Sequence, residues 1–178
     1  LEEEQSGHVI LDSDALIHFL ALCPYGVEKY SYYFNHFPVL SLNLGIMETT
    51  EKAVEIILLL RSENEINLKL LVNEVETLAS LFGLSVTPSD EYYGWSYDPD
   101  SQLRKSYKEA YKKAYNKELK EVPTHGGLET GYMSRIFPDM DIVTMGPNCI
   151  DIHTPQERLE IKTLYEVHDF LKNWLGEL

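Results

Sequence analysis

Cysteine is scarce in this sequence. Among 178 residues there are two, Cys23 and Cys149, and they do not form a C-x-x-C pair. Isolated cysteines indicate neither a disulfide framework nor a cysteine-based zinc site. The scarcity is typical of proteins from a reducing compartment, so we expect a cytoplasmic location.

Basic residues and long apolar runs are also in short supply. Fifteen Lys and Arg stand against 29 Asp and Glu, which gives a net charge of −14. This charge repels phosphate backbones, so we expect no nucleic-acid partner. No apolar run approaches the ~18–20 residues that cross a membrane, and no signal peptide opens the chain, so we expect no membrane partner. The chain starts at Leu1 rather than Met, and we expect the true N-terminus to lie upstream.

Several familiar catalytic motifs do not occur. The sequence has no H-x-D pair, no G-x-S-x-G and no P-loop, and outside its acidic start it has no Glu-Glu pair. A hydrolytic metal site needs three or four protein ligands and an open position. The residues offer one good candidate, so this chain by itself does not make an active site.

The first part of the chain has an α+β pattern. Apolar periodicity predicts a helix over 15–22, a strand over 39–47 that forms a hairpin with a strand over 53–61, a helix from the capping-box spacing at 62–65 to Phe82, and a strand over 84–87. This order of helix, strand, strand, helix and strand is a ferredoxin-like unit without its first strand.

The second part has an α/β pattern. A turn-rich junction at 93–100 marks a domain boundary. Beyond it we predict a helix over 103–114, a short helix near Leu128, a buried strand over 142–145 and a final helix opened by a capping box at 163–166. The order of this part is expected to be helix, strand, helix, strand and helix, and an α/β layer with only two strands is too thin to stand alone. The sequence therefore predicts two incomplete halves.

His153 is the first candidate for chemistry. It lies in a loop beyond the predicted strand 142–145, and Pro155 holds Thr154 extended, so the histidine is not absorbed into a helix. A neutral imidazole there suits a metal ligand or a general base. Spacing alone favours an ordinary surface histidine, and Asp151 either orients the ring or faces solvent.

A glycine-rich stretch is the second candidate. His125-Gly126-Gly127-Leu128-Glu129-Thr130-Gly131 lets backbone N–H groups approach a ligand, and a helix then begins near Leu128. The same glycines also suit a tight turn. Glu129 either binds an ammonium group or stabilises the helix start, and the spacing identifies no partner for His125.

Two strand residues complete the candidates. Arg61 ends an apolar strand, where a guanidinium can meet a substrate carboxylate, although most arginines at strand ends are simply solvated. Asn43 interrupts the neighbouring strand, as either a polar contact or a bulge.

Taken together, these motifs resemble a known family. H-G-G-L-E-T-G at 125–131, M-G-P at 145–147 and H-T-P-Q-E-R at 153–158 resemble the C-terminal signature of the aminoacyl-histidine dipeptidases, also called Xaa-His or cytosolic non-specific dipeptidases. These are di-zinc metallopeptidases related to carnosinase and peptidase T. Upstream matches include S-L-N-L-G at 41–45, the strand ending in Arg61-Ser62 and Y-G-W at 93–95, so the resemblance runs from about Asp12 to the C-terminus.

The resemblance implies an architecture. In this family a ferredoxin-like lid is inserted in an α/β catalytic domain that binds two metal ions. Residues 1–92 then correspond to the later part of the lid, which also suits dimerisation, and residues 93–178 to the C-terminal part of the catalytic domain. The expected fold class is α/β plus α+β.

The resemblance also implies roles. His153 falls on the family's final metal ligand, and Arg61 on a lid arginine that meets the substrate's C-terminal carboxylate. Gly126, Gly127 and Glu129 line the substrate pocket, with Glu129 at the free amine as a further hypothesis. Asn43 and His125 complete the expected substrate-binding set.

The chain departs from the family in two ways. Gly126 and Thr130 replace the usual Ala and Cys of H-A-G-L-E-C-G, which puts substrate preference in question. The other metal ligands and the general base belong to an N-terminal half that this chain does not contain.

We therefore expect the C-terminal portion of a dipeptidase that uses two divalent ions, zinc first and cobalt or manganese next, and that is inactive without its N-terminal half. The expected partners are a dipeptide, that half and a second copy through the lid. The rival interpretation is a non-catalytic binding or dimerisation module, and metal binding at His153 separates the two.

Overall fold

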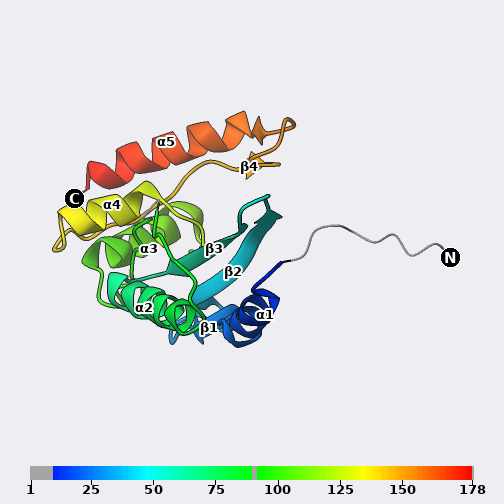
Figure 1. Cartoon of the computed structure of the whole chain (residues 1–178). Coiled ribbons are helices and arrows are strands. Elements are labelled where there is room, and N and C mark those ends of the chain that lie inside the picture. The colour runs from blue at the N-terminus through cyan, green and yellow to red at the C-terminus, as the bar shows by residue number, and fades with distance from the viewer. Residues whose placement is uncertain (1–9, 90–91, 178) are drawn as a thin grey trace. The chain divides into compact units, whose positions relative to one another are not determined.

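The computed structural model describes residues 10–89 and 92–177 (Figure 1). The chain divides into two compact units, the first formed by Leu1–Ser96 with Pro123–Leu128 and the second by Tyr97–Val122 with Glu129–Leu178. Among the described residues, no helix is both long and apolar enough to cross a bilayer.

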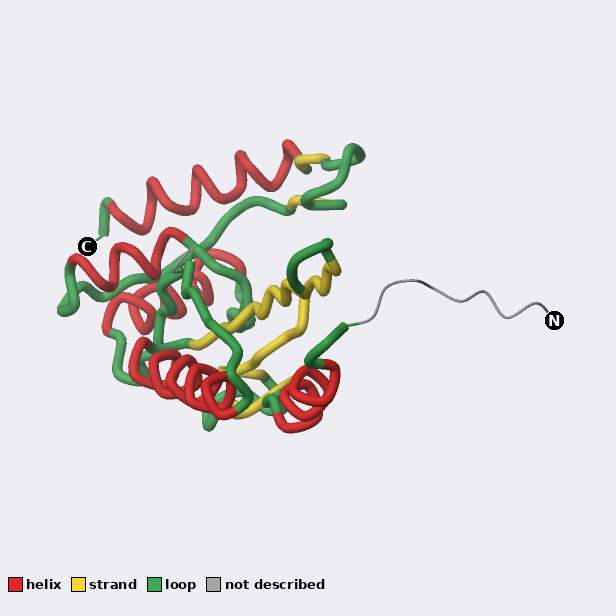
Figure 2. The backbone as a smooth tube through the Cα atoms, in the orientation of Figure 1, coloured by secondary structure: helices red, strands yellow, loops and turns green. Residues whose placement is uncertain are grey.

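The first unit is built on a three-stranded antiparallel sheet. Its strands β1 (Gly26–Tyr30), β2 (Pro38–Thr49) and β3 (Val54–Ser62) lie in the order β1-β2-β3. The long β2–β3 hairpin is yellow in Figure 2 and closes through Thr50, whose N–H donates to the Ala53 carbonyl at 2.8 Å. A register shift between Leu44 and Ile46 places a bulge at Gly45, where the sequence has its strand glycine.

One face of this sheet is covered by two helices. Side chains of α1 (Ser13–Leu22) and α2 (Glu65–Leu81) pack on it, and the buried core joins one residue of α1, two of β2 and three of α2: Phe19, Leu40, Leu42, Leu71, Val75 and Ala79. Burying a leucine side chain contributes ~1.5–3 kcal/mol, so these contacts hold the layers together. Exposure alternates along β3, which leaves its odd-numbered residues on the opposite, uncovered face.

The start of α2 differs from the capping-box expectation. Asn64 is the N-cap, and its side-chain oxygen accepts from the Asn67 N–H at 2.9 Å. Ser62, the predicted first member of the box, is the last residue of β3 instead. At the other end, Gly83 follows with a φ of +70°, a left-handed conformation that favours glycine.

The first unit differs from the prediction at two places. Strand β1 was not predicted, because five residues with a single strong apolar side chain, Val27, carry little periodicity. Residues 84–87 are not a strand, since no neighbouring strand lies beside them among the described residues. The observed order is therefore helix, three strands and helix.

The second unit consists mainly of helices. They are α3 (Gln102–Tyr115), α4 (Glu129–Ile136) and α5 (Ile161–Leu175), with a small hairpin of β4 (Cys149–Ile150) and β5 (Arg158–Leu159) before α5. Helices α3 and α5 meet through aromatic rings, with Tyr107 5.2 Å from Phe170 and 5.1 Å from Trp174 between ring centroids. The Trp174 indole N–H also donates to the Ser106 hydroxyl at 2.9 Å, so its buried polar atom is satisfied.

A loop carboxylate fastens the start of α3. Asp141 accepts from the hydroxyl of buried Ser101 at 2.6 Å and from the Leu103 N–H at 2.9 Å, while Ser101 accepts from the Arg104 N–H at 2.9 Å. Burial by itself raises the pKa of Asp141, but these hydrogen bonds outweigh it and hold the pKa below its usual range. The sequence pattern did not reveal this long-range cap.

The predictions for the second unit fail at two places. Residues 142–145 carry no strand hydrogen bonds, because no partner strand lies beside them in the described part of the chain. Helix α5 begins at Ile161 after Glu160, and Thr163 lies inside it, where its hydroxyl donates to the Glu160 carbonyl at 2.8 Å. The capping box predicted at 163–166 is therefore wrong.

Candidate functional site

The uncovered face of the first unit's sheet carries two of the predicted substrate-binding residues. Arg61 on β3 is paired in register with Ser41 on β2, and Asn43 follows two residues later on the same face. Arg61 and Asn43 are exposed. No described carboxylate forms an ion pair with Arg61, so its charge stays available to an anion from outside the unit.

His125 lies against this pair. Its ring Nε2 is 2.7 Å from the Ser41 hydroxyl oxygen, and its backbone carbonyl accepts from the Arg61 Nη1 at 3.1 Å. The Phe37 ring meets the imidazole edge to face, with centroids 6.1 Å apart. The structure therefore supplies the partners that sequence spacing did not identify. The alternation of β2 was the available signal for Ser41, since it places Ser41 on the face of Asn43.

The surroundings of His125 favour its uncharged form. Burial lowers the pKa of the imidazole, and the positive charge of Arg61 lowers it further. The ring is therefore neutral at pH 7, where one nitrogen donates and the other accepts. A neutral ring beside Arg61 leaves the guanidinium as the local positive charge.

The glycines after His125 are held by close packing. A Cβ on Gly127 would lie 2.2 Å from the Tyr92 ring, so a side chain there forces that ring to move. The Gly126 N–H donates to the Thr124 hydroxyl at 3.2 Å. Both glycines thus belong to a compact turn of the first unit, which keeps the turn alternative open beside ligand binding.

Glu129 belongs to the second unit. It is the first residue of α4 and is exposed. An acidic side chain in the first turn stabilises a helix through its dipole. This position suits the helix-start alternative, and it also leaves the carboxylate open to a ligand.

His153 lies in the turn between β4 and β5. Its backbone φ is +66°, a left-handed conformation that few non-glycine residues adopt, and Asp151 in the same turn has a φ of +55°. His153 is exposed, and its imidazole makes no hydrogen bond to the described residues. Arg158 binds the Asp151 carboxylate at 2.8 Å, so Asp151 does not orient the histidine.

The side chains near His153 show whether the described residues could hold a metal ion by themselves. Within the described ranges no three His, Cys, Asp or Glu side chains gather closely enough to hold an ion. A divalent metal needs three or four protein ligands in a catalytic site. The described residues therefore supply too few donors for a metal ion at His153, and its role as a ligand stays a prediction.

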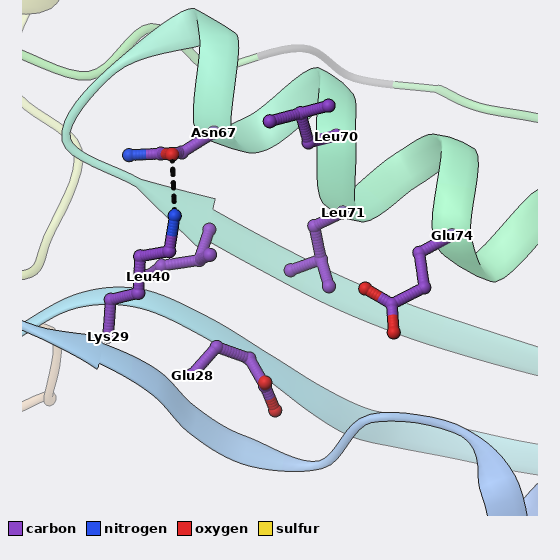
Figure 3. A pocket seen from close by; sticks show the side chains of 7 residues that line it. All are labelled: Glu28, Lys29, Leu40, Asn67, Leu70, Leu71 and Glu74. Atoms are coloured by element: carbon purple, nitrogen blue, oxygen red, sulfur yellow. Dashed lines mark hydrogen bonds between the residues drawn. The ribbon is translucent and has the colours of Figure 1, made fainter.

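A hollow elsewhere on the first unit contains none of the predicted site residues. It lies between β1 and α2 and is lined by Glu28, Lys29, Leu40, Asn67, Leu70, Leu71 and Glu74 (Figure 3). The Lys29 ammonium donates to the Asn67 side-chain oxygen at 2.8 Å across it. This bond ties strand to helix, and the hollow has no nucleophile or imidazole.

The fold and these residues define a class. This is a mixed α/β protein that presents an exposed arginine beside a neutral histidine on a sheet face, and an exposed histidine, His153, on a separate hairpin. A family-wide sequence pattern, that of Peptidase family M20/M25/M40, matches residues 2–177. The chain therefore belongs to this peptidase family, whose members generally use divalent metals.

Two relatives narrow the relationship to dipeptidases. The chain is 30% identical over 190 residues to the cytosol non-specific dipeptidase of Escherichia coli (strain K12), covering 99% of this chain and 39% of that protein. It also matches the crystal structure of aminoacylhistidine dipeptidase from Vibrio alginolyticus, with a TM-score of 0.85 and 29% identity, over 96% of this chain and 35% of that one. The resemblance to the aminoacyl-histidine dipeptidases is confirmed, and the chain spans well under half the length of these relatives.

Proposed function

We propose that this chain is the substrate-carboxylate-binding and metal-supporting part of a cytosolic M20 metallodipeptidase. Residues 1–92 would form the later part of a ferredoxin-like lid, and residues 93–178 the C-terminal part of the catalytic domain. The observation that carries the proposal is the match of 96% of the chain to a dipeptidase structure at a TM-score of 0.85. The substrates proposed are dipeptides with a free C-terminus, Xaa-His among them.

Arg61 is the proposed anchor of the substrate carboxylate. One of its five N–H donors is engaged by the His125 carbonyl, which leaves donors on the Nε and Nη2 edge for a bidentate contact. Asn43 on the same face offers an amide to the dipeptide's polar groups, and the Gly126-Gly127 turn offers close backbone approach. Glu129 is proposed to bind the free amine of the substrate.

His153 is the proposed metal ligand of this chain. When bound, two divalent ions of this kind polarise a peptide carbonyl and lower the pKa of a bound water. Zinc is the first choice for an imidazole ligand, with cobalt or manganese as alternatives. His153 is exposed in a turn where its backbone is left-handed, and its imidazole makes no hydrogen bond to the described residues, so a ring nitrogen is free to coordinate. The other ligands and the general base would come from further polypeptide, without which the chain is inactive.

Activity measurements test this proposal. Hydrolysis of several dipeptides would be compared for the 178-residue chain and a form extended to the length of its relatives, each with zinc, cobalt or manganese. The extended form should be active and the short chain inactive. His153→Ala should lower kcat/KM of the extended form at least about 1,000-fold, since it removes a metal ligand.

His168→Ala is the matched control, because His168 is also exposed and, among the described residues, its ring is hydrogen-bonded to its neighbour Asp169 alone, at 3.0 Å. It should leave kcat/KM unchanged. An extended form that is inactive with every metal, or an active His153→Ala form, would contradict the proposal.

A second function, assembly through the lid, is favoured by one observation. Strand β3 is an edge of the three-stranded sheet, and Ile57 and Leu59 are exposed on its uncovered face. Such an edge invites pairing with another strand. Sedimentation of the extended form tests it: a Leu59→Lys change should shift a dimer to monomer, and an unchanged dimer would contradict this use of the edge.

A further inference from the structure

His125 meets two opposed strand residues with two different groups. Its ring bonds to Ser41 on β2, and its backbone carbonyl accepts from Arg61 on β3. Ser41 and Arg61 are direct partners in the sheet register. These two contacts hold the 123–128 segment against the sheet at the Ser41–Arg61 pair.

We propose that His125 is a positioning residue for Arg61, and that Ser41 acts through it by fixing the imidazole. This inference rests on the proposed function, in which Arg61 binds the carboxylate of the substrate. It assigns the His125 ring to the protein itself rather than to direct contact with the dipeptide. By accepting from Nη1, the His125 carbonyl favours the guanidinium orientation in which the Nε and Nη2 donors face the substrate carboxylate.

The serine contact matters because side chains, and not strand pairing, fasten this segment to the sheet. In the described part of the chain, no backbone–backbone hydrogen bond joins 123–128 to the sheet. The Ser41 bond and the Phe37 ring locate the imidazole, and the backbone carbonyl follows because it belongs to the same residue. If the imidazole loses its contact with Ser41, we expect the His125 carbonyl to be less well positioned to accept from Arg61.

Ordering Arg61 before the substrate arrives has a clear physical benefit. An arginine side chain has several rotatable bonds, and a binding event that must freeze them is weakened by the lost entropy. A bond from Nη1 to a carbonyl removes part of this freedom in advance. Because a carbonyl is uncharged, it leaves the full positive charge for the carboxylate, whereas an Asp or Glu partner would neutralise it.

The charge state of the histidine supports the same role. The imidazole is partly buried beside Arg61 and has a lowered pKa, so it stays neutral and does not repel the guanidinium. The charged group that faces the imidazole is Arg61 on β3. Its other neighbours are uncharged: Ser41 on β2 and the ring of Phe37, which precedes β2.

Steady-state kinetics of the extended enzyme test the proposal. For dipeptides with a free carboxylate, His125→Ala should raise KM about tenfold, the loss expected when a pre-ordered charged contact is weakened, with kcat within about twofold. For the same dipeptides amidated at the C-terminus, KM should not respond. Ser41→Ala should behave like His125→Ala, and Ser41→Thr, which keeps the hydroxyl, should restore the original KM.

A double variant separates positioning from general damage. In an Arg61→Ala background, His125→Ala should raise KM no further, because the residue it positions is gone. An equal effect on free and amidated substrates, or full additivity with Arg61→Ala, would overturn the proposal.

A binding measurement that needs no catalysis tests the role of His125 independently of the proposed dipeptidase activity. Acetate, a minimal carboxylate, would be titrated into the 178-residue chain while the Arg61 Nε–H signal is followed by NMR. Acetate should perturb this signal, and His125→Ala should weaken its apparent affinity at least about threefold, with His168→Ala as the control. If the extended form lacks dipeptidase activity, the proposed function fails, but this titration still decides the role of His125. No perturbation, or equal affinity in His125→Ala, would overturn the positioning role.

Discussion

At the scale of single residues, the molecule relies on places where two backbones come very close. Gly94 is the sharpest case, because a Cβ there would lie 2.2 Å from the Ser62 carbonyl oxygen and 2.5 Å from the Glu63 carbonyl carbon. These are backbone atoms and cannot rotate away as the Tyr92 ring beside Gly127 can. Ser96 adds a hydroxyl that donates to the Glu63 carbonyl at 3.2 Å. The segment around Gly94 thus holds the connection from β3 to α2, just beyond Arg61.

Gly94→Ala should therefore destabilise the first unit. The added methyl must displace backbone, so we expect a loss of about 1–3 kcal/mol in the free energy of unfolding. Urea denaturation followed by circular dichroism measures it. Gly146→Ala is the matched control, since nothing lies within 4 Å of the place its new methyl group would take and its φ is ordinary. Similar stabilities for the two variants would mean that the close approach carries no energetic weight.

At the scale of elements, helices and strands follow different rules in this chain. Helices α1, α2, α3 and α4 lie close to their expected places, because an amphipathic helix satisfies its own backbone and needs only an apolar surface to cover. A strand makes its backbone hydrogen bonds to a neighbouring strand, so it forms only where such a neighbour lies beside it. The β2–β3 hairpin supplies its own partner and was predicted, whereas 84–87 and 142–145 have apolar sequences but no described neighbour to pair with.

The N-cap of α2 gives the prediction at this scale. Asn64→Ala removes the side-chain oxygen that accepts from the Asn67 N–H, and we expect it to cost about 1 kcal/mol of stability. Asn73→Ala is the same change at an exposed position inside the helix, where alanine is the better helix former, so it should be neutral or slightly stabilising. Denaturation midpoints and amide exchange at Asn67 would report both. An Asn64→Ala form as stable as Asn73→Ala would contradict the cap assignment.

At the scale of the whole molecule, the residues proposed to bind substrate and metal are divided between the two units. One unit contains the arginine and its histidine, and the other contains the hairpin histidine. Neither unit holds a group of three metal donors within the described residues. The chain spans 39% of the length of its Escherichia coli relative, so the remaining ligands are proposed to lie on further polypeptide.

This division predicts weak metal binding by the 178-residue chain alone. One imidazole without further protein ligands should hold zinc no more tightly than about 10 μM at pH 7. Isothermal titration calorimetry would measure the affinity, and a chelator should leave the thermal unfolding midpoint unchanged. Zinc bound at nanomolar affinity and lost on His153→Ala would show that the chain assembles a complete site by itself.

Local periodicity and ordered motifs were enough to predict the helices, the β2–β3 hairpin and the family. The sequence also picked out Arg61, His125 and His153 as candidates by residue type and place. The contacts of His125 with Ser41 and Arg61, which lie 84 and 64 residues away, became visible only in the folded chain. The same holds for the cap that Asp141 places on α3 and for the failure of 142–145 to form a strand. The physical reason is that pairing, burial and charge compensation depend on which distant groups meet, and no spacing along the chain specifies that.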